Sequence, residues 1–186
     1  MSNGVTNGQE KVLLTGVSGF IGLHCAKQLI ETGFKVRGTL RSHEKQMQVE
    51  HVMTTHNIDA ESLEFTLLDL TTEAGWEAAM VGCDYVMHVA SPFWIANPKN
   101  EAEMMAPAIE GTLRVLRAAQ KAKVKRVILT SSIVSMMSSI RRGVFTADDW
   151  TDVTYPNLST YIKSKTLAER AAWNFVDENE GPELVV

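Results

Sequence analysis

The feature that most constrains the fold of this chain is a repeated alternation between short apolar runs and longer segments with helical spacing of apolar residues. Residues 11–15 (KVLLT) form the first apolar run, and Ile21, Cys25 and Leu29 then recur with helical spacing over residues 20–32. Further strands are expected at residues 35–40, 63–68, 85–89, 126–130 and 183–186, and further helices at residues 42–56, 73–80, 101–122 and 161–178. This order predicts an α/β fold in which helices cover both faces of a parallel sheet.

The length of the chain indicates one globular domain. Its 186 residues, of which 45% are hydrophobic, are enough to bury a single sizeable core. Residues 1–10 are rich in Asn, Gly, Ser, Thr and Gln, which predicts a flexible tail before a domain over residues 11–186. Residues 184–186 (LVV) read as a strand that has only begun, so we expect this domain to be cut at its C-terminal end.

Composition and charge argue against several classes of partner. The formal net charge is -4 and acidic and basic residues are interspersed, so we expect no nucleic-acid partner. No stretch approaches the roughly 18 apolar residues of a membrane helix, and we expect a cytoplasmic protein that does not bind membranes. Cys25, Cys83 and the five histidines lack the spacing of metal ligands, so no metal site is expected.

A glycine pattern lies between the first expected strand and the first expected helix. Residues 16–22 match GxxGxxG. Gly16 would permit a tight turn, Gly19 would let a pyrophosphate approach backbone amides, and Gly22 would let the helix pack closely on the strand. Alone, the pattern is also compatible with a turn that binds no ligand. Its place between strand and helix predicts a Rossmann-type, doubly wound sheet that binds a dinucleotide.

The end of the second expected strand predicts which nicotinamide cofactor is bound. Enzymes that use NAD place a carboxylate there for the ribose hydroxyls, whereas those that use NADP accommodate a 2′-phosphate with a cation. Residues 38–41 (GTLR) contain no carboxylate, and Arg41 could form charge-assisted hydrogen bonds to a 2′-phosphate. Lys45, one turn into the next helix, could assist. These residues predict NADP(H), unless Arg41 is an ordinary solvated arginine.

Two motifs near the end of the chain indicate proton transfer. Tyr161 and Lys165 form a YxxxK pair, and their spacing places phenol and ammonium on one helix face. A phenol is a poor acid–base group at neutral pH, but a neighbouring cation favours its phenolate form. Such a pair alone is more often an ordinary surface tyrosine and lysine. However, residues 130–132 (TSS) follow a buried strand, where a hydroxyl can hydrogen-bond a substrate oxygen.

The motifs TGVSGFIG, Asp69-Leu70, HVAS, TSS and YIKSK occur in the order of the extended short-chain dehydrogenases/reductases, which the sequence resembles over about residues 11–186. Residues 37–42 (RGTLRS), 86–93 (VMHVASPF) and 161–173 (YIKSKTLAERAAW) are similar to the branch of dihydroflavonol 4-reductases, cinnamoyl-CoA reductases and methylglyoxal/aldehyde reductases. The resemblance implies NADPH-dependent reduction of a ketone or aldehyde of a small molecule. It also implies a smaller C-terminal substrate lobe, which we expect this chain to lack.

The resemblance gives roles to individual residues. The implied catalytic residues are Ser132, Tyr161 and Lys165. Joined to the residues derived above, the expected cofactor-binding set is Gly16, Gly19, Phe20, Ile21, Gly22, Arg41, Lys45, Asp69, Leu70, Val89, Ala90, Ser91, Thr130, Tyr161 and Lys165. The glycine segment would line the pyrophosphate, Asp69 and Leu70 the adenine, and residues 89–91 the ribose and nicotinamide.

Two positions depart from the family pattern. Ala108 stands where many members carry Asn, so we do not expect a proton relay that uses that Asn. Met137 stands where flavonoid reductases tend to carry a polar residue, so we do not expect flavonoid specificity. Two other functions stay open, namely a nucleotide-sugar epimerase or dehydratase with bound NAD, and a dinucleotide-binding module without turnover. The sequence is compatible with a monomer or a homodimer.

Overall fold

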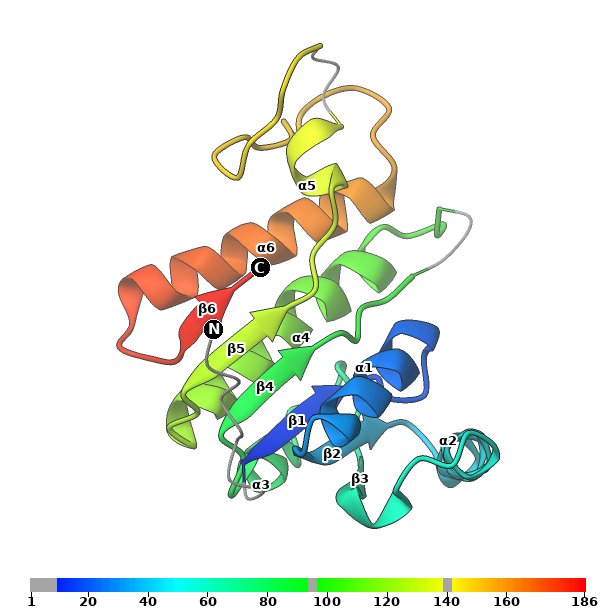
Figure 1. Cartoon of the computed structure of the whole chain (residues 1–186). Coiled ribbons are helices and arrows are strands. Elements are labelled where there is room, and N and C mark those ends of the chain that lie inside the picture. The colour runs from blue at the N-terminus through cyan, green and yellow to red at the C-terminus, as the bar shows by residue number, and fades with distance from the viewer. Residues whose placement is uncertain (1–9, 94–96, 139–141) are drawn as a thin grey trace.

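The computed structural model describes residues 10–93, 97–138 and 142–186, so most of the expected N-terminal tail lies outside it. Six strands form one parallel sheet in the order β3-β2-β1-β4-β5-β6, with helices on both faces (Figure 1). The strands are β1 (Lys11–Thr15), β2 (Lys35–Leu40), β3 (Leu63–Leu67), β4 (Tyr85–His88), β5 (Arg126–Leu129) and β6 (Glu183–Val185). The helices are α1 (Phe20–Glu31), α2 (His43–Thr55), the 3-10 turn η1 (Ala60–Ser62), α3 (Trp76–Met80), α4 (Ala102–Lys121), α5 (Val134–Met137) and α6 (Thr160–Glu178). This strand order confirms the predicted doubly wound fold.

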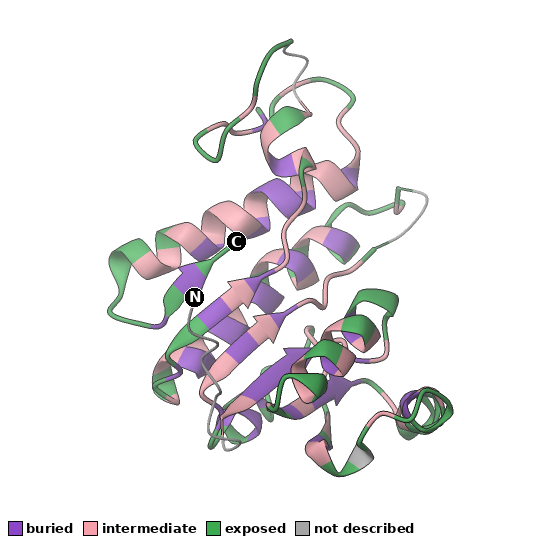
Figure 2. Cartoon of the chain, in the orientation of Figure 1, coloured by how far each residue is buried: buried purple, intermediate pink, exposed green. Residues whose placement is uncertain are grey.

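The sheet separates two apolar cores, because successive side chains of a strand point to opposite faces. On β1, Leu13 packs into the core that contains α3, α4 and α6, whereas Leu14 packs into the core under α1 and α2. Both leucines are fully buried, and buried residues follow the central strands throughout (Figure 2). The near-continuous apolar runs in the sequence therefore reflect strands that are covered on both faces.

The site is set by the point where the chain crosses the sheet. β1 pairs with β2 on one side and with β4 on the other, so the connections that leave β1 and β4 diverge toward opposite faces. In open parallel sheets, a crevice forms at the carboxyl ends of the strands at such a switch point. The loops after β1 and β4, which contain the glycine pattern and residues 89–93, border that crevice.

Two local elements differ from the sequence-based expectation. Helix α3 begins at Trp76 rather than at residue 73, because Gly75 has a left-handed φ of 92° and the Trp76 indole N–H donates to the Thr72 carbonyl at 3.0 Å. Helix α5 has only four residues, too few for an apolar period to reveal it. Residues 142–159, between α5 and α6, contain no helix or strand.

Candidate functional site

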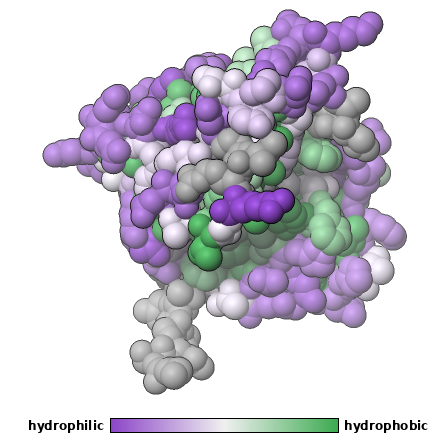
Figure 3. Space-filling view, turned by 90° about the horizontal axis from the view of Figure 1, so that it is seen from above, coloured by the Kyte–Doolittle hydropathy of each residue, from purple (hydrophilic) through white to green (hydrophobic). Residues whose placement is uncertain are grey.

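A cavity of about 760 Å³ opens at the carboxyl ends of the strands, within the size range of small-molecule sites. Figure 3 views this end of the molecule and shows apolar surface inside a hollow edged by hydrophilic residues. The lining comprises Gly16, Ser18, Gly19, Phe20, Ile21, Gly22, Thr39, Arg41, Leu68, Asp69, Leu70, Thr71, Trp76, Val89, Ala90, Ser91, Pro92, Phe93, Glu103, Pro107, Thr130, Ser131, Tyr161 and Lys165. It includes every predicted cofactor-binding residue except Lys45.

The glycines of the turn after β1 are required by close backbone packing. Gly16 has a φ of 70°, and a Cβ on it would lie 3.1 Å from the Cα and Cβ of Ala90. A Cβ on Gly22 would lie only 2.2 Å from the carbonyl oxygen of Gly16. The turn therefore lies directly against the loop after β4, and its three glycines line the cavity.

The first turn of α1 leaves backbone donors available to a ligand. Gly19 is its N-cap and has no side chain that could accept from these amides, and the first turn contains no acidic residue. The first three residues of the helix, Phe20, Ile21 and Gly22, all line the cavity. The amides and the positive end of the helix dipole favour an anion here, so this turn fits the pyrophosphate of a dinucleotide.

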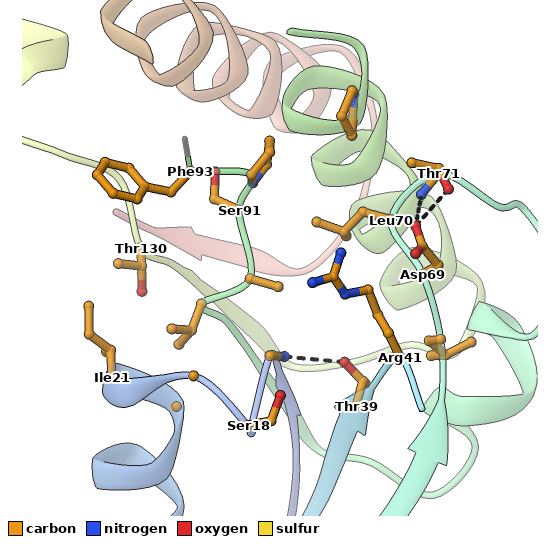
Figure 4. Close-up of a pocket in the computed structure, with 18 of the residues that line it drawn as sticks. Ser18, Ile21, Thr39, Arg41, Asp69, Leu70, Thr71, Ser91, Phe93 and Thr130 are labelled. Carbon is orange, nitrogen blue, oxygen red and sulfur yellow. Dashed lines mark hydrogen bonds between the residues drawn. The ribbon is translucent and has the colours of Figure 1, made fainter. Parts of the chain in front are cut away.

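Arg41 projects into the cavity beside Leu70, at the end opposite Phe93 (Figure 4). Among the described residues it forms no hydrogen bond or ion pair, so its guanidinium keeps its donors for a ligand. Its neighbour Asp69 accepts from the amide and hydroxyl of Thr71 at 2.7 and 2.6 Å. These bonds, helped by the charge of Arg41, hold the pKa of Asp69 below its usual range.

Lys45 does not face the cavity. Its ammonium donates to the side chain of Gln48 at 2.9 Å on the exposed face of α2. Its backbone amide donates to Ser42, the N-cap of that helix, at 3.3 Å. Lys45 is therefore not among the residues that line the described cavity, and Arg41 is the cation at this end of it.

His88 at the end of β4 holds the adjacent loop through Thr15. The Thr15 hydroxyl accepts from the amides of Val89 and Ala90 at 3.0 and 2.9 Å and lies 2.8 Å from His88 Nδ1. Because the two amides occupy both acceptor lone pairs of the hydroxyl, it donates its one proton to Nδ1, and the histidine is the Nε2–H tautomer. Complete burial, reinforced by the charge of Lys165, lowers the pKa of His88 to about 3. A neutral histidine thus fixes two residues of the cavity wall.

Tyr161 and Lys165 lie one turn apart at the start of α6, and both line the cavity. The Lys165 ammonium is buried and donates to the carbonyl of Thr130 at 2.8 Å. Burial lowers the pKa of Lys165, and the charge of Glu169 opposes that shift. The ring of Tyr161 contacts Phe93 edge to face, with ring centroids 5.3 Å apart. The structure therefore brings phenol and ammonium into one pocket.

The first turn of α6 is held by two side-chain caps. The Ser159 hydroxyl accepts from the amide of Ile162 at 3.3 Å, and the side chain of Asn97 accepts from the amide of Thr160 at 3.1 Å. Asn97 belongs to the segment that follows Phe93, so the loop after β4 also determines where α6 begins.

Ser132 has a different relation to the cavity from the other predicted residues. It is half-buried before α5 and does not belong to the lining, whereas its neighbours Thr130 and Ser131 do. Its hydroxyl lies 3.5 Å from the amide of Val134, at the limit of a hydrogen bond. The structure thus places Ser132 beside the pocket that Tyr161 and Lys165 share.

Several lining residues were missed by sequence reasoning. Thr39 accepts from the amide of Gly16 at 3.3 Å, and Phe93 contacts Tyr161. Pro107 and Glu103 reach the cavity from α4. Thr39 and Phe93 stand within motifs that carried the family resemblance, which was the available signal; the two α4 residues had none. Within the described ranges no cluster of potential metal ligands occurs, and no helix there is long and apolar enough to cross a bilayer.

Comparison with known proteins agrees with this arrangement. Anthocyanidin reductase from Vitis vinifera is 37% identical over 181 residues, which cover 92% of this chain and 53% of that protein. A bifunctional dihydroflavonol 4-reductase/flavanone 4-reductase from Malus domestica is 36% identical, with 91% of this chain and 51% of that protein covered. The chain thus spans about half the length of these relatives.

A solved structure with the same arrangement is that of the yeast methylglyoxal/isovaleraldehyde reductase in complex with NADPH. It superposes with a TM-score of 0.81 at 26% identity, covering 94% of this chain and 55% of that one. The model of the NAD dependent epimerase/dehydratase family matches residues 12–185. The resemblance inferred from the motifs is confirmed, and the chain belongs to the NAD dependent epimerase/dehydratase family.

Proposed function

We propose that this chain is the NADP(H)-binding domain of an oxidoreductase that reduces the carbonyl group of a small organic molecule to an alcohol. The observation that carries the proposal is the convergence of three features on one cavity. These features are the glycine turn after β1, the Arg41 guanidinium after β2 and the Tyr161–Lys165 pair of α6. Family membership and the reductases among its relatives support the same reaction class.

Each feature supplies a different part of the proposed reaction. A bound nicotinamide cofactor supplies a hydride to the carbonyl carbon. Tyr161 donates its phenolic proton to the carbonyl oxygen, as a general acid. Lys165, fixed by Thr130, faces the same pocket and stabilises the phenolate that remains. In the reverse direction Tyr161 would take the proton of the alcohol, and a bound oxidised cofactor would accept its hydride.

Ser132 is the third proposed catalytic residue. A hydroxyl donor directed at the carbonyl oxygen stabilises the negative charge that develops there during hydride transfer. Its backbone is held at the α5 corner, where the amide of Ser135 donates to the Ser132 carbonyl at 2.8 Å. A rotation of the Ser132 side chain toward the cavity would complete the group, since Ser131 on one side already lines it.

The cofactor preference is proposed from Arg41. Its guanidinium makes no hydrogen bond or ion pair with a described residue and lines the cavity beside Asp69 and Leu70, the residues proposed to hold the adenine, so it could bind a 2′-phosphate. A neutral ribose diol would instead favour a carboxylate acceptor. Asp69 is engaged with Thr71 and therefore a poor candidate for that role. The yeast reductase complex with NADPH supports this choice.

Two other functions remain to be separated from the proposal. A nucleotide-sugar epimerase or dehydratase would use the glycine turn and the YxxxK pair with NAD, and Arg41 disfavours it. A binding module without turnover would keep the cavity but perform no reaction.

Titration of the purified chain with NADPH and with NADH, followed by the fluorescence of the reduced nicotinamide, tests the proposal. We expect NADPH to bind, and to bind more tightly than NADH. A panel of aldehydes and ketones, with NADPH consumption followed by the absorbance of the reduced nicotinamide, then separates a reductase from a binding module. Equal or tighter binding of NADH would favour the epimerase function, and binding of neither would refute a dinucleotide site.

A further inference from the structure

A carboxylate behind the proposed catalytic pair has no assigned role. Glu169 lies one helical turn after Lys165 on α6 and accepts a hydrogen bond from the hydroxyl of Ser131. It does not line the large cavity. It lines a second, small polar cavity with room for about one water molecule, together with His88, Thr112, Thr130, Ser131 and Lys165.

The hydrogen bonds at this point run in one direction. Ser131 has a single hydroxyl proton and gives it to Glu169, so in the 3.1 Å contact between Ser131 and Ser135 the Ser135 hydroxyl must donate. The two hydrogen bonds therefore lead from Ser135 of α5 through Ser131 to the Glu169 carboxylate of α6. These hydrogen bonds connect the corner that carries Ser132 to the helix that carries Tyr161 and Lys165, and Ser135 is buried there.

The outer side of the same corner is also fixed to α6. The hydroxyl of Thr151 donates to the Val134 carbonyl at 2.6 Å, and the backbone amide of Thr151 donates to the Ser135 carbonyl at 2.7 Å. Arg170, the residue after Glu169, donates to the Thr151 carbonyl at 3.1 Å. Consecutive residues of α6 thus hold α5 from two sides, and Glu169 is the inner of the two contacts.

The charges around Lys165 complete the argument. Thr130, Ser131 and Lys165 line both cavities, so the Lys165 side chain stands between the cofactor cavity and Glu169. His88 from β4 and Thr112 from α4 share the small cavity with it, and Tyr161 on its own helix shares the large one. The carbonyl of Thr130, the residue after β5, accepts its hydrogen bond. Among the described residues that line the small cavity, Glu169 is the acid.

We propose that Glu169 is a positioning residue of this site, which holds the Ser131–Ser132 corner against α6 and keeps the positive charge on Lys165. The inference rests on the proposed function, because it assigns Glu169 a task for the groups named there. Glu169 acts through Ser131 and Lys165 and does not itself contact the cavity where the cofactor is proposed to bind.

Three substitutions separate the two parts of this role. Glu169→Gln keeps the size of the side chain and an oxygen for Ser131 but removes the charge. Ser131→Ala removes the link to α5 and keeps the charge. Asp177→Asn removes a charge from an exposed position two turns further along α6 and serves as the control.

Two measurements on the 186-residue chain, without substrate, test the parts. The side-chain ammonium of Lys165 is titrated by NMR in protein with labelled lysine, and its signal is identified by its loss in Lys165→Arg. Hydrogen exchange is followed at the amide of Ser135. We expect Glu169→Gln to move the Lys165 titration midpoint to lower pH, and Ser131→Ala to speed Ser135 exchange about two- to tenfold, the loss of one hydrogen bond.

The outcomes distinguish this inference from the proposed function. If Glu169→Gln titrates like Asp177→Asn, the charge role is wrong, and if Ser135 exchange in Ser131→Ala equals that of the unsubstituted protein, the link is wrong. NADPH binding is measured in parallel on all variants. If the unsubstituted chain does not bind NADPH, the proposed function is refuted. The Lys165 titration would still decide whether Glu169 maintains the positive charge on Lys165.

Discussion

Nδ1 of His88 lies 2.8 Å from the hydroxyl of Thr15, and that hydroxyl in turn holds the amides of Val89 and Ala90. The buried ring is an acceptor at Nδ1 and a donor at Nε2, toward Thr112 at 3.4 Å. A second proton would leave Nδ1 without its acceptor role and place a charge in the core. The loop that borders the glycine turn therefore depends on a histidine that stays neutral.

The first prediction concerns acid stability. Burial lowers the pKa of His88 from 6.5 to about 3, so between these values the unfolded chain binds a proton that the folded chain does not. The free energy of unfolding should therefore fall as the pH falls from 6.5 toward 3, by about 1.4 kcal/mol per pH unit from this group. Nitrogen NMR of the ring checks the cause. Signals of the neutral Nε2–H tautomer should persist to about pH 4, and a ring that gains its proton above pH 6 would contradict the assignment.

The second prediction concerns Tyr161. Tyr161→Phe keeps a ring that can make the edge-to-face contact with Phe93, so folding and NADPH affinity should barely change. Turnover of a carbonyl substrate that the unsubstituted protein reduces should fall by about 10²- to 10⁴-fold, the contribution of a general acid. Steady-state kinetics and cofactor titration measure the two effects. Near-normal turnover would remove Tyr161 from the proposed mechanism.

The third prediction concerns cofactor choice. Arg41→Ala should weaken NADPH binding by about 10- to 100-fold, the loss of a charge-assisted contact, and should change NADH binding far less. Lys45→Ala is the matched control, because Lys45 lies nearby on α2 but bonds to Gln48 instead of facing the cavity. Titrations with both cofactors decide the matter. An equal loss for NADPH and NADH would mean that Arg41 does not contact the 2′-phosphate.

The fourth prediction concerns the glycine turn. In Gly22→Ala the new Cβ would lie 2.2 Å from the Gly16 carbonyl oxygen, and backbone atoms cannot yield as a flexible side chain does. We expect a loss of about 1–3 kcal/mol in the free energy of unfolding, together with weaker NADPH binding. Gly181→Ala, whose Cβ would meet nothing closer than 3.8 Å, should stay within about 0.5 kcal/mol. Urea unfolding of the two variants provides the comparison, and equal stabilities would argue against crowding at Gly22.

Much of the fold was predictable because each element has a local signal. The run KVLLT and the glycines after it identify β1 and the turn. The predicted sheet follows from the repeated alternation of apolar runs and helical segments along the chain. Helix α5 and the true start of α3 at Trp76 had no such signal. A four-residue helix has no period, and the sequence does not show that Gly75 adopts the left-handed conformation that precedes α3.

The site was predictable where residues act through a fixed spacing along the chain. Tyr161 and Lys165 lie where a four-residue period places them, and Gly16 and Gly22 are required by backbone distances. The directions of side chains were not predictable: Lys45 follows the surface of α2, and Ser132 lies beside the lining rather than in it. Contacts between distant segments, such as that of Glu169 with Ser131, have no signature in the sequence. The compartment and the oligomeric state stay predictions.

The opposite directions of Leu13 and Leu14 fix the register of β1 in the sheet, and with it the position of the turn that borders the cavity. A slip of β1 by a single residue would exchange every side chain between the two cores, at the cost of burying the wrong set on each face. It would also carry Thr15 away from His88 and Gly16 away from Ala90. Burial of these two leucines, which do not line the cavity, therefore determines the position of the turn on which a pyrophosphate would lie.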